Sequence, residues 1–389
     1  MASHAMGSHA MGSRSGVRIR VGVAGLGVVA QTVHLPLLTR RGDLFEIAAL
    51  CDLSASLCDS MGERYGVAQE HRYSGLAQML ADERLDAVLV LTSGSHGADV
   101  LECLGAGTAL LCEKPLSWSQ READAVVALD SGSPRVQVAY MKQYDPAVCR
   151  MIELLPPPET IRSVDVEVLH PTTASQAAFA NLQPRANDID PLAIESLVAR
   201  DQQVLDVALG DACQRVRELY SGAVLGSIVH DLSLVRLLVG SPTRIDLARA
   251  WPPAATPPSI DVAGTLPGGA HLSVRWLYLP DYPAYRETVT VHHERGTMRV
   301  MFPSPYLLNA PSELVVVETA GRGEQRTVFR SVDEEFENEL VGLHAMVTTG
   351  AAPMSGPVQG REDIRTAQQI MRAYCEGNGL DLGGEAATS

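Results

Sequence analysis

The chain has 389 residues, of which 46% are hydrophobic, and its formal net charge is −15 at pH 7. This length suits two domains of ordinary size, and the composition is that of a soluble globular protein. The acidic balance argues against nucleic acid and anionic membranes as partners, because both bind basic patches. No apolar run approaches the roughly 20 residues that span a bilayer.

Residues 1–13 repeat the segment Ser-His-Ala-Met-Gly-Ser, which is typical of an expression tag. We expect the natural sequence to begin near Arg14, although the tag could have replaced a native leader. The fold is therefore interpreted from residue 14 onward.

The cysteines are expected to be free thiols. The seven of them contain no C-x-x-C pair, and most lie in apolar runs, which favours burial in a reducing cytoplasm over disulfides or zinc ligands. The adjacent His292 and His293 lie on an expected strand, so that their rings point to opposite faces and cannot share a metal ion. The sequence thus predicts a cytoplasmic protein without a metal site.

Residues 14–145 alternate between β-prone and helical patterns that are joined by short turns. Strands are expected at 18–24, 45–52, 86–92, 108–115 and 135–141, and helices at 31–41, 54–66, 95–107 and 119–129. Strict alternation of this kind predicts a doubly wound parallel sheet, that is, a Rossmann domain.

The first expected strand runs into the sequence GLGVVA at residues 25–30, which opens a helix. Gly25 allows the tight turn, Gly27 lets the backbone approach a pyrophosphate, and Ala30 permits close packing of helix on strand. The N–H groups of the following helix then attract the phosphates. The sequence predicts a dinucleotide site here, formed by Gly25, Gly27, Val28 and Val29.

Asp52 ends the second expected strand, where an acid accepts hydrogen bonds from a ribose diol and repels a 2′-phosphate. NAD(H) is therefore favoured as the cofactor. NADP(H) stays open, because Arg64 and Arg72 follow nearby in the sequence. A glycine turn with an unrelated surface aspartate is the structural alternative.

Residues 146–389 predict a second, α+β domain, with a helical insertion at about 174–219 and an apolar helix at 221–240. Strands are expected at 161–170, 242–251, 259–266, 270–279, 287–293, 296–302 and 313–320, and two helices near 332–349 and 361–376. Runs of strands without intervening helices predict a large open, mostly antiparallel sheet. Such a sheet would expose apolar surface in a monomer, so we expect a homo-oligomer, a dimer or tetramer.

A cleft between the two domains is expected at the carboxyl ends of the parallel strands. Lys114 lies at this edge, where it can donate to a substrate oxygen, and Glu113 beside it can pair with it. Thr92 and His96 follow the neighbouring strand, and His96 suits either a helix cap or a contact with the cofactor. For Lys114 the alternative is a surface lysine before a proline turn.

The helix at 221–240 has the apolar stripe of a core helix, yet His230 and Asp231 interrupt it. A histidine in such surroundings is more often a hydrogen-bonded core residue than a catalyst. Ser227 lies one turn earlier on the same face as His230. Asp231 is rotated by about 100° and is expected to face a neighbouring segment.

Four segments together resemble the Gfo/Idh/MocA family, the relatives of glucose–fructose oxidoreductase and inositol dehydrogenase. They are VGVAGLGVVAQTVHLPLL at 21–38, HGADVLECLGAGTALLCEKPLS at 96–117, YMKQYDPA at 140–147 and GAVLGSIVHDLSLVRLLVG at 222–240. The resemblance covers nearly all of the chain beyond the tag. It implies a Rossmann domain, a second domain whose open sheet often forms oligomer interfaces, and NAD(P)-dependent chemistry at a carbon–oxygen bond of a sugar or cyclitol.

The resemblance also implies roles for single residues. Lys114 matches the active-site lysine of the family's E-K-P motif, and His230 matches the usual acid/base of its D-x-x-x-H-D pattern. The family's aspartate falls at Gly226, so the ordinary set of lysine, aspartate and histidine is incomplete. Further expected contacts with cofactor or substrate are Lys142, Tyr144, Ser227 and Asp231, and Tyr282, Tyr285 and Arg286 are candidates for pocket or interface.

The leading hypothesis is an NAD(P)-dependent oxidoreductase that moves a hydride to or from a sugar-like, cyclitol or related small polar substrate. Lys114 would bind the reacting group, and His230, near its usual pKa, would donate or remove the proton. Reduction of a carbonyl is slightly favoured, because it needs a proton donor more than an extended network of bases. The alternatives are a lyase, epimerase or hydrolase that cycles retained NAD, an imine reductase and, less favoured, a non-catalytic dinucleotide sensor.

Overall fold

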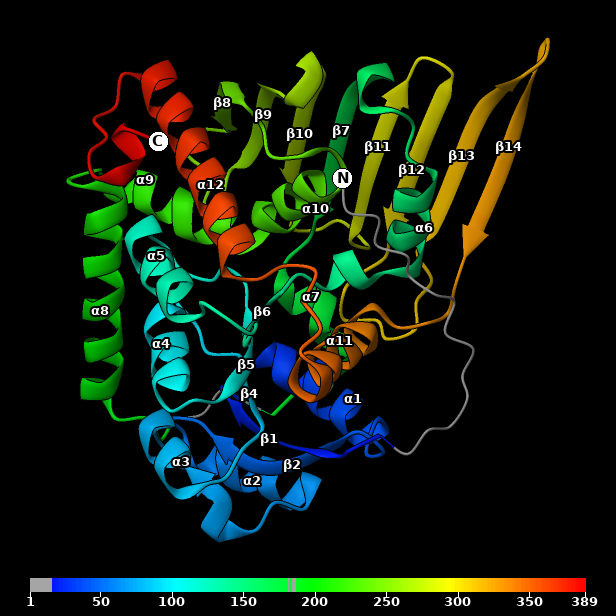
Figure 1. Ribbon diagram of the computed structural model, residues 1–389. Coiled ribbons are helices and arrows are strands. Elements are labelled where there is room, and N and C mark those ends of the chain that lie inside the picture. Colours follow the sequence, from blue (N-terminus) through cyan, green and yellow to red (C-terminus); the bar gives the residue numbers. More distant parts are fainter. Residues whose placement is uncertain (1–15, 181, 184–186) are drawn as a thin grey trace.

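Two large sheets organise the protein (Figure 1). The computed structural model describes residues 16–180, 182–183 and 187–389, so that the expected tag lies outside the described residues. The first sheet is parallel, and the second is larger and mostly antiparallel. The predicted fold class is thereby confirmed.

The first sheet has six parallel strands in the order β3-β2-β1-β4-β5-β6. The strands are β1 (Ile19–Ala24), β2 (Phe45–Cys51), β3 (Arg72–Tyr73), β4 (Ala87–Val90), β5 (Ala109–Glu113) and β6 (Val136–Ala139). β4 and β6 are buried along their whole length, as expected of parallel strands that are covered on both faces. Strand order reverses between β1 and β4, and sheets of this kind bind ligands at the carboxyl ends of such neighbours.

Helices cover both faces of this sheet. They are α1 (Leu35–Arg40), α2 (Ala55–Tyr65), α3 (Leu76–Asp82), α4 (Gly97–Gly105) and α5 (Gln120–Leu129). The helix predicted at 31–41 begins with a π-helical turn, Ala30–His34, and continues as α1. The sequence predicts neither β3 nor α3, since both are too short to show a hydrophobic period.

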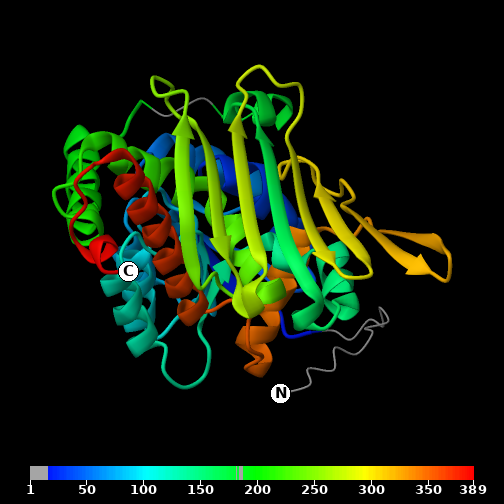
Figure 2. The same cartoon turned by 90° about the horizontal axis from the view of Figure 1, so that it is seen from above.

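The second sheet has eight strands in the order β14-β13-β12-β11-β7-β10-β9-β8. They are β7 (Ile161–His170), β8 (Arg244–Trp251), β9 (Ser259–Thr265), β10 (His271–Tyr278), β11 (Arg286–His293), β12 (Gly296–Phe302), β13 (Glu313–Ala320) and β14 (Gly323–Arg330). β7 and β10 pair parallel, and the other neighbours pair antiparallel. Figure 2 shows these strands in the foreground with most helices behind them.

The remaining helices surround the second sheet and return to the first. They are α6 (Pro146–Leu154), α7 (Thr173–Ala177), α8 (Pro191–Leu209), α9 (Gln214–Glu218), α10 (Val229–Val239), α11 (Glu335–Thr349) and α12 (Pro357–Asn378). Among these, α8 lies along α4 and α5 of the first sheet (Figure 1), and Arg200 on α8 forms an ion pair with Asp99 on α4 at 3.0 Å. The insertion is therefore in contact with the Rossmann half.

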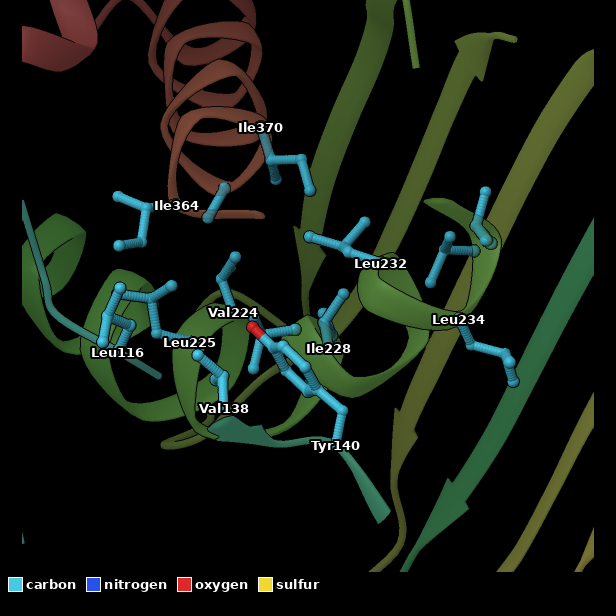
Figure 3. Close-up of a cluster of buried hydrophobic side chains, with 14 of the residues drawn as sticks. Leu116, Val138, Tyr140, Val224, Leu225, Ile228, Leu232, Leu234, Ile364 and Ile370 are labelled. Atoms are coloured by element: carbon cyan, nitrogen blue, oxygen red, sulfur yellow. The ribbon is translucent and has the colours of Figure 1, made fainter. Parts of the chain in front are cut away.

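A continuous helical run, Gln214–Val239, is long and apolar enough to cross a membrane by composition, but 61% of its most apolar stretch is buried inside the protein. Val224, Leu225 and Ile228 pack between Ile364 of α12 and Val138 of β6 (Figure 3). The run is thus a core helix between the two sheets. Its position brings the middle of the helix, where the sequence has histidine and aspartate, to the junction of the two halves.

Candidate active site

A cavity of about 370 Å³ lies where the glycine-rich loop, the carboxyl ends of β4 and β5, and the core helix meet. The predicted site residues that line it are Gly27, Val28, Val29, Thr92, His96, Glu113, Lys114, Lys142, Ser227, His230 and the pocket candidate Tyr285, whereas Tyr282 and Arg286 do not line it. Residues that are far apart in the sequence are therefore brought to one surface. Gly25, Asp52, Tyr144 and Asp231, which were also predicted, do not line the cavity.

The glycine-rich loop has the form that a dinucleotide requires. Gly25 has a φ of +93°, and a Cβ there would lie 2.6 Å from the carbonyl carbon of Leu91, so that only glycine fits. A Cβ at Gly27 would meet nothing within 4 Å, which leaves open space beside the backbone of the cavity wall. Crowding at the first glycine and space at the second fit a loop that admits phosphate groups.

Asp52 organises this loop. Its Oδ2 accepts the backbone N–H of Leu26 at 2.8 Å, and its Oδ1 accepts the N–H of Ser54 at 2.9 Å. Each carboxylate oxygen retains further acceptor capacity, so the residue can also hold the diol of a ribose. Arg72, by contrast, is directed into α2, where it donates to the carbonyl of Val67 at 2.8 Å and to Asp59 at 3.1 Å.

Lys114 is oriented by Gly226, the residue at the position where the resemblance implies an aspartate. Its Nζ donates to the carbonyl oxygen of Gly226 at 2.5 Å. Burial, together with the nearby charge of Lys142, lowers the pKa of Lys114, and Glu113 opposes this shift. A backbone carbonyl thus orients the amine without supplying the full negative charge of an aspartate.

His230 lines the cavity, and its ring meets that of Tyr140 edge to face at 6.3 Å. Burial and the charges of Lys114 and Lys142 hold the pKa of His230 well below its ordinary value of 6.5. The sequence-based expectation of an ordinary pKa therefore does not apply. The imidazole is therefore neutral at pH 7, and its proton affinity is lower than that of a free histidine.

A buried polar cluster adjoins the cavity, and two of its members, Lys142 and Tyr285, also line it. Lys142 Nζ and the Tyr285 hydroxyl both donate to Oε2 of Glu287, which is fully buried. Burial lowers the pKa of Lys142, but Glu287 and Asp231 outweigh it, so that the pKa is raised. Burial and the charge of Glu287 raise the pKa of Asp231 well above its usual range. Asp231 thus faces a neighbouring segment and not the cavity.

Other predicted residues support the site from outside or from its edge. The two ring nitrogens of His96 lie 2.7 Å from the carbonyl oxygens of Thr92 and Pro115. The imidazole thus bridges the segment that follows β4 and the segment that follows β5. The Tyr144 hydroxyl accepts the backbone N–H of Met354 at 3.2 Å and packs away from the cavity. Ser227 accepts a hydrogen bond from the indole of Trp276 at 2.9 Å.

The structure adds lining residues that the sequence analysis does not name: His170, Thr173, Gln176 and Tyr306. His170 is the last residue of β7, and its ring lies 5.0 Å from that of Trp276. Its place at a strand end is a signal that sequence reasoning could have used. Thr173 and Gln176 belong to the helix-prone segment, and nothing in their spacing indicates that they face the cavity.

Residues 19–140 match the sequence model of the GFO_IDH_MocA family, which is described as an oxidoreductase family with an NAD-binding Rossmann fold. Inositol 2-dehydrogenase 3 of Saccharopolyspora erythraea is 36% identical over 140 residues, which are 35% of this chain and 40% of that protein. Inositol 2-dehydrogenase/D-chiro-inositol 3-dehydrogenase of Shouchella clausii is 26% identical over 215 residues, 54% of this chain and 59% of that protein. The chain thus spans about half the length of the curated relatives it matches.

Solved structures resemble this chain over nearly its whole length. An aldose-aldose oxidoreductase from Caulobacter crescentus, complexed with glycerol, has a TM-score of 0.69 at 18% identity and covers 92% of this chain and 98% of its own. A myo-inositol 2-dehydrogenase from Lactobacillus plantarum has a TM-score of 0.68 at 17% identity with the same coverage. At these identities the likeness establishes the shared two-sheet fold.

Proposed function

We propose that this chain, which through residues 19–140 belongs to the Gfo/Idh/MocA family of NAD-binding oxidoreductases, oxidises or reduces a carbon–oxygen bond of a sugar-like or cyclitol substrate. The observation that carries the proposal is that Lys114 and a neutral His230 line one cavity with the glycine-rich loop. The relatives named for their action on inositol support the substrate class.

The residues present fit a dinucleotide, since Gly27 leaves open space at the loop and Asp52 offers acceptors for a diol. NAD, when bound, supplies the hydride acceptor or donor. In the oxidation direction, neutral His230 would take the proton of the substrate hydroxyl. The Lys114 ammonium donates to the same oxygen and stabilises the negative charge that develops on it.

The state of His230 bears on the direction of the reaction. The lowered pKa keeps the imidazole in the neutral form that an oxidation needs at pH 7, whereas a reduction needs its protonated form. We therefore propose oxidation of an alcohol as the direction favoured at neutral pH. The oxidation rate should rise as pH increases through the lowered pKa of His230, and the reduction rate should fall.

The polar side chains around the cavity suit a substrate with several hydroxyl groups. Gln176, Thr173 and Ser227 offer hydroxyl or amide groups, and His170 and Tyr306 add ring donors and acceptors. We propose a polyol, such as an inositol or an aldose, as the substrate. NAD(H) is the proposed cofactor, on the evidence of Asp52.

The first test combines substrate screening with substitution of His230. Purified protein is incubated with NAD and a panel of cyclitols and aldoses, and NADH is followed by its absorbance. We expect turnover with at least one of them, and we expect His230→Ala to lower kcat by about 10²–10⁴-fold while the Kd for NADH is kept.

His292→Ala is a matched control, because this histidine pairs with Asp165 at 2.9 Å on the second sheet and does not line the cavity. It should leave kcat unchanged. Full activity in His230→Ala would contradict the role of the imidazole, and failure of the wild-type protein to bind NADH would contradict the function as a whole.

A second candidate is a redox-neutral enzyme that retains NAD through its cycle. One observation favours it: Thr173 and Ala177 of α7 lie beside Val28, and the backbone N–H of Gln183 donates to Gln31 at 3.1 Å, so this segment passes over the glycine-rich loop. NAD that stays with the protein through gel filtration, with turnover that leaves NADH absorbance unchanged, would support this candidate over the first.

A further inference from the structure

The amino-terminal end of α2 receives a carboxylate from a distant part of the chain. The hydroxyl of Ser54, which caps the helix, donates to Oδ1 of Asp188 at 2.6 Å. The backbone N–H of Ser56 donates to Oδ2 of the same residue at 2.8 Å. Asp188 lies two residues before Asp190, which caps α8. An acid from the segment that leads into α8 is thus brought to a helix that packs on the first sheet.

This helix end adjoins the residue on which the choice of cofactor depends. Asp52 is two residues before Ser54 and accepts its backbone N–H. In NADP(H), one hydroxyl of the diol that Asp52 would hold carries a phosphate, which needs donors or cations close by. The Ser54 hydroxyl and the Ser56 N–H, at the positive end of α2, are donors of the required kind. Both already bind Asp188.

Arg64 and Arg72, the two arginines because of which the sequence does not exclude NADP(H), do not lie at the amino-terminal end of α2. Arg72 donates to the carbonyl of Val67 and to Asp59, beneath α2. Arg64 lies in the last turn of α2, at the opposite end from Ser54, with its guanidinium over the ring of Tyr65 at 5.5 Å. Neither side chain is placed at the helix start.

We propose that Asp188 is a cofactor-specificity residue: its carboxylate occupies the donors that a 2′-phosphate would need and repels that phosphate, so that Asp52 and Asp188 together select NAD(H). The inference rests on the proposed function and specifies how its cofactor is chosen. The hydrogen bonds from Ser54 and Ser56 lower the pKa of Asp188 to about 2, so that the carboxylate is ionised throughout the neutral range.

Direct binding measurements test this proposal. The Kd values for NADH and NADPH are measured by isothermal titration on the full chain, without any substrate. The wild-type protein should bind NADH more tightly. Asp188→Asn, which keeps an acceptor oxygen but removes the charge, should reduce the ratio of the two affinities by about tenfold, because one repulsive unit charge beside the phosphate is gone. The change should come from tighter NADPH binding, and Asp188→Arg should extend it further.

Asp190→Asn is the matched control. Asp190 lies two residues away and caps α8 by accepting the N–H of Leu192 at 3.0 Å, a role that asparagine also performs. It removes the same formal charge from the same segment without touching α2, and it should leave the affinity ratio unchanged.

The results distinguish a failure of the specificity proposal from a failure of the proposed function. If the wild-type protein binds NADH and Asp188→Asn keeps the wild-type ratio, or if Asp190→Asn changes the ratio equally, the specificity role of Asp188 is overturned and the proposed function stands. If the folded wild-type protein binds neither dinucleotide, both are overturned.

Discussion

Gly226 is the residue at which this chain departs from the D-x-x-x-H-D pattern of the Gfo/Idh/MocA family that its sequence resembles. Its carbonyl oxygen receives the Lys114 amine, where a family member would present a carboxylate. A carbonyl dipole stabilises the ammonium less than a full charge does, which agrees with the lowered pKa of Lys114. The departure thus changes the charge of the site and keeps the lysine in place.

Restoring the carboxylate with Gly226→Asp should raise the pKa of Lys114. A Cβ at this position would lie 3.3 Å from the carbonyl oxygen of Ser221, a close contact that small shifts can relieve. In the proposed reaction, activity falls at alkaline pH when Lys114 loses its proton. The alkaline limb of the pH–rate profile should therefore shift to higher pH by about 1 unit or more. Gly226→Ala controls for the added Cβ, and equal profiles for the two variants would contradict this account.

Among the structural elements, the glycine-rich loop has the most demanding backbone. Gly25 needs a positive φ and a close approach to Leu91, whereas Gly27 borders open space. The first glycine therefore serves the fold, and the second serves the ligand. Both glycines belong to one sequence motif, and only the packing around each distinguishes their roles.

Gly25→Ala and Gly27→Ala should therefore behave differently. Gly25→Ala should lower the free energy of unfolding by about 1–3 kcal/mol, because the new Cβ is strained and crowded. Gly27→Ala should change stability by less than about 0.5 kcal/mol yet weaken NADH binding by about tenfold or more. Thermal melts and titration with NADH measure both effects. Wild-type affinity in Gly27→Ala would show that the loop does not hold the dinucleotide.

At the scale of the whole molecule, the chain crosses back from the second sheet to the first. α11 follows β14, and its Phe336, Leu340 and Leu343 lie in the same apolar core as the residues of β1. This return also buries Glu339, whose carboxylate oxygens have no hydrogen-bond partner among the described residues. Burial and the charges of Glu113 and Glu335 raise the pKa of Glu339 well above its usual 4.5.

Glu339→Gln should stabilise the protein at neutral pH. Because the folded-state pKa is raised, the contribution of Glu339 to stability is fully present below pH 4.5 and is lost as pH rises through the raised value. The variant avoids this loss, so its advantage in free energy of unfolding should be near zero in acid and grow to about 1–3 kcal/mol at neutral pH. Urea unfolding at several pH values measures the difference.

Glu337→Gln, on the same helix, is the control. Glu337 is partly exposed and pairs with Arg41 at 3.3 Å, so its removal should give no gain that grows with pH. An equal, pH-dependent gain in both variants would contradict the assignment to Glu339.

The expected homo-oligomer stays a prediction. The outer face of the second sheet carries polar and charged side chains, among them Asp165, Arg275 and Arg299 around a shallow hollow. These side chains are mostly polar, whereas the expectation from the sequence rested on exposed apolar surface. Light scattering on the purified chain measures the state directly.

Apart from β3 and α3, the strands and helices of the Rossmann half could be predicted from the sequence, because buried parallel strands are continuous apolar runs and the helices between them are amphipathic. β14 could not, because nearly all of its residues are exposed and no alternation marks it. The catalytic candidates could also be predicted from the sequence, because Lys114 follows a strand and His230 interrupts an apolar stripe.

The sequence by itself determined the fold class, the glycine-rich loop and the residue types of the site, since each rests on local pattern. Only the tertiary structure decided that Lys114 binds the carbonyl of Gly226, 112 residues away, and that Asp188 reaches Ser54, 134 residues away. Tyr144 and Asp231, which local sequence placed with the site, turn away from the cavity for the same reason. Contacts across such separations depend on how the two sheets pack, and no local period in the chain records them.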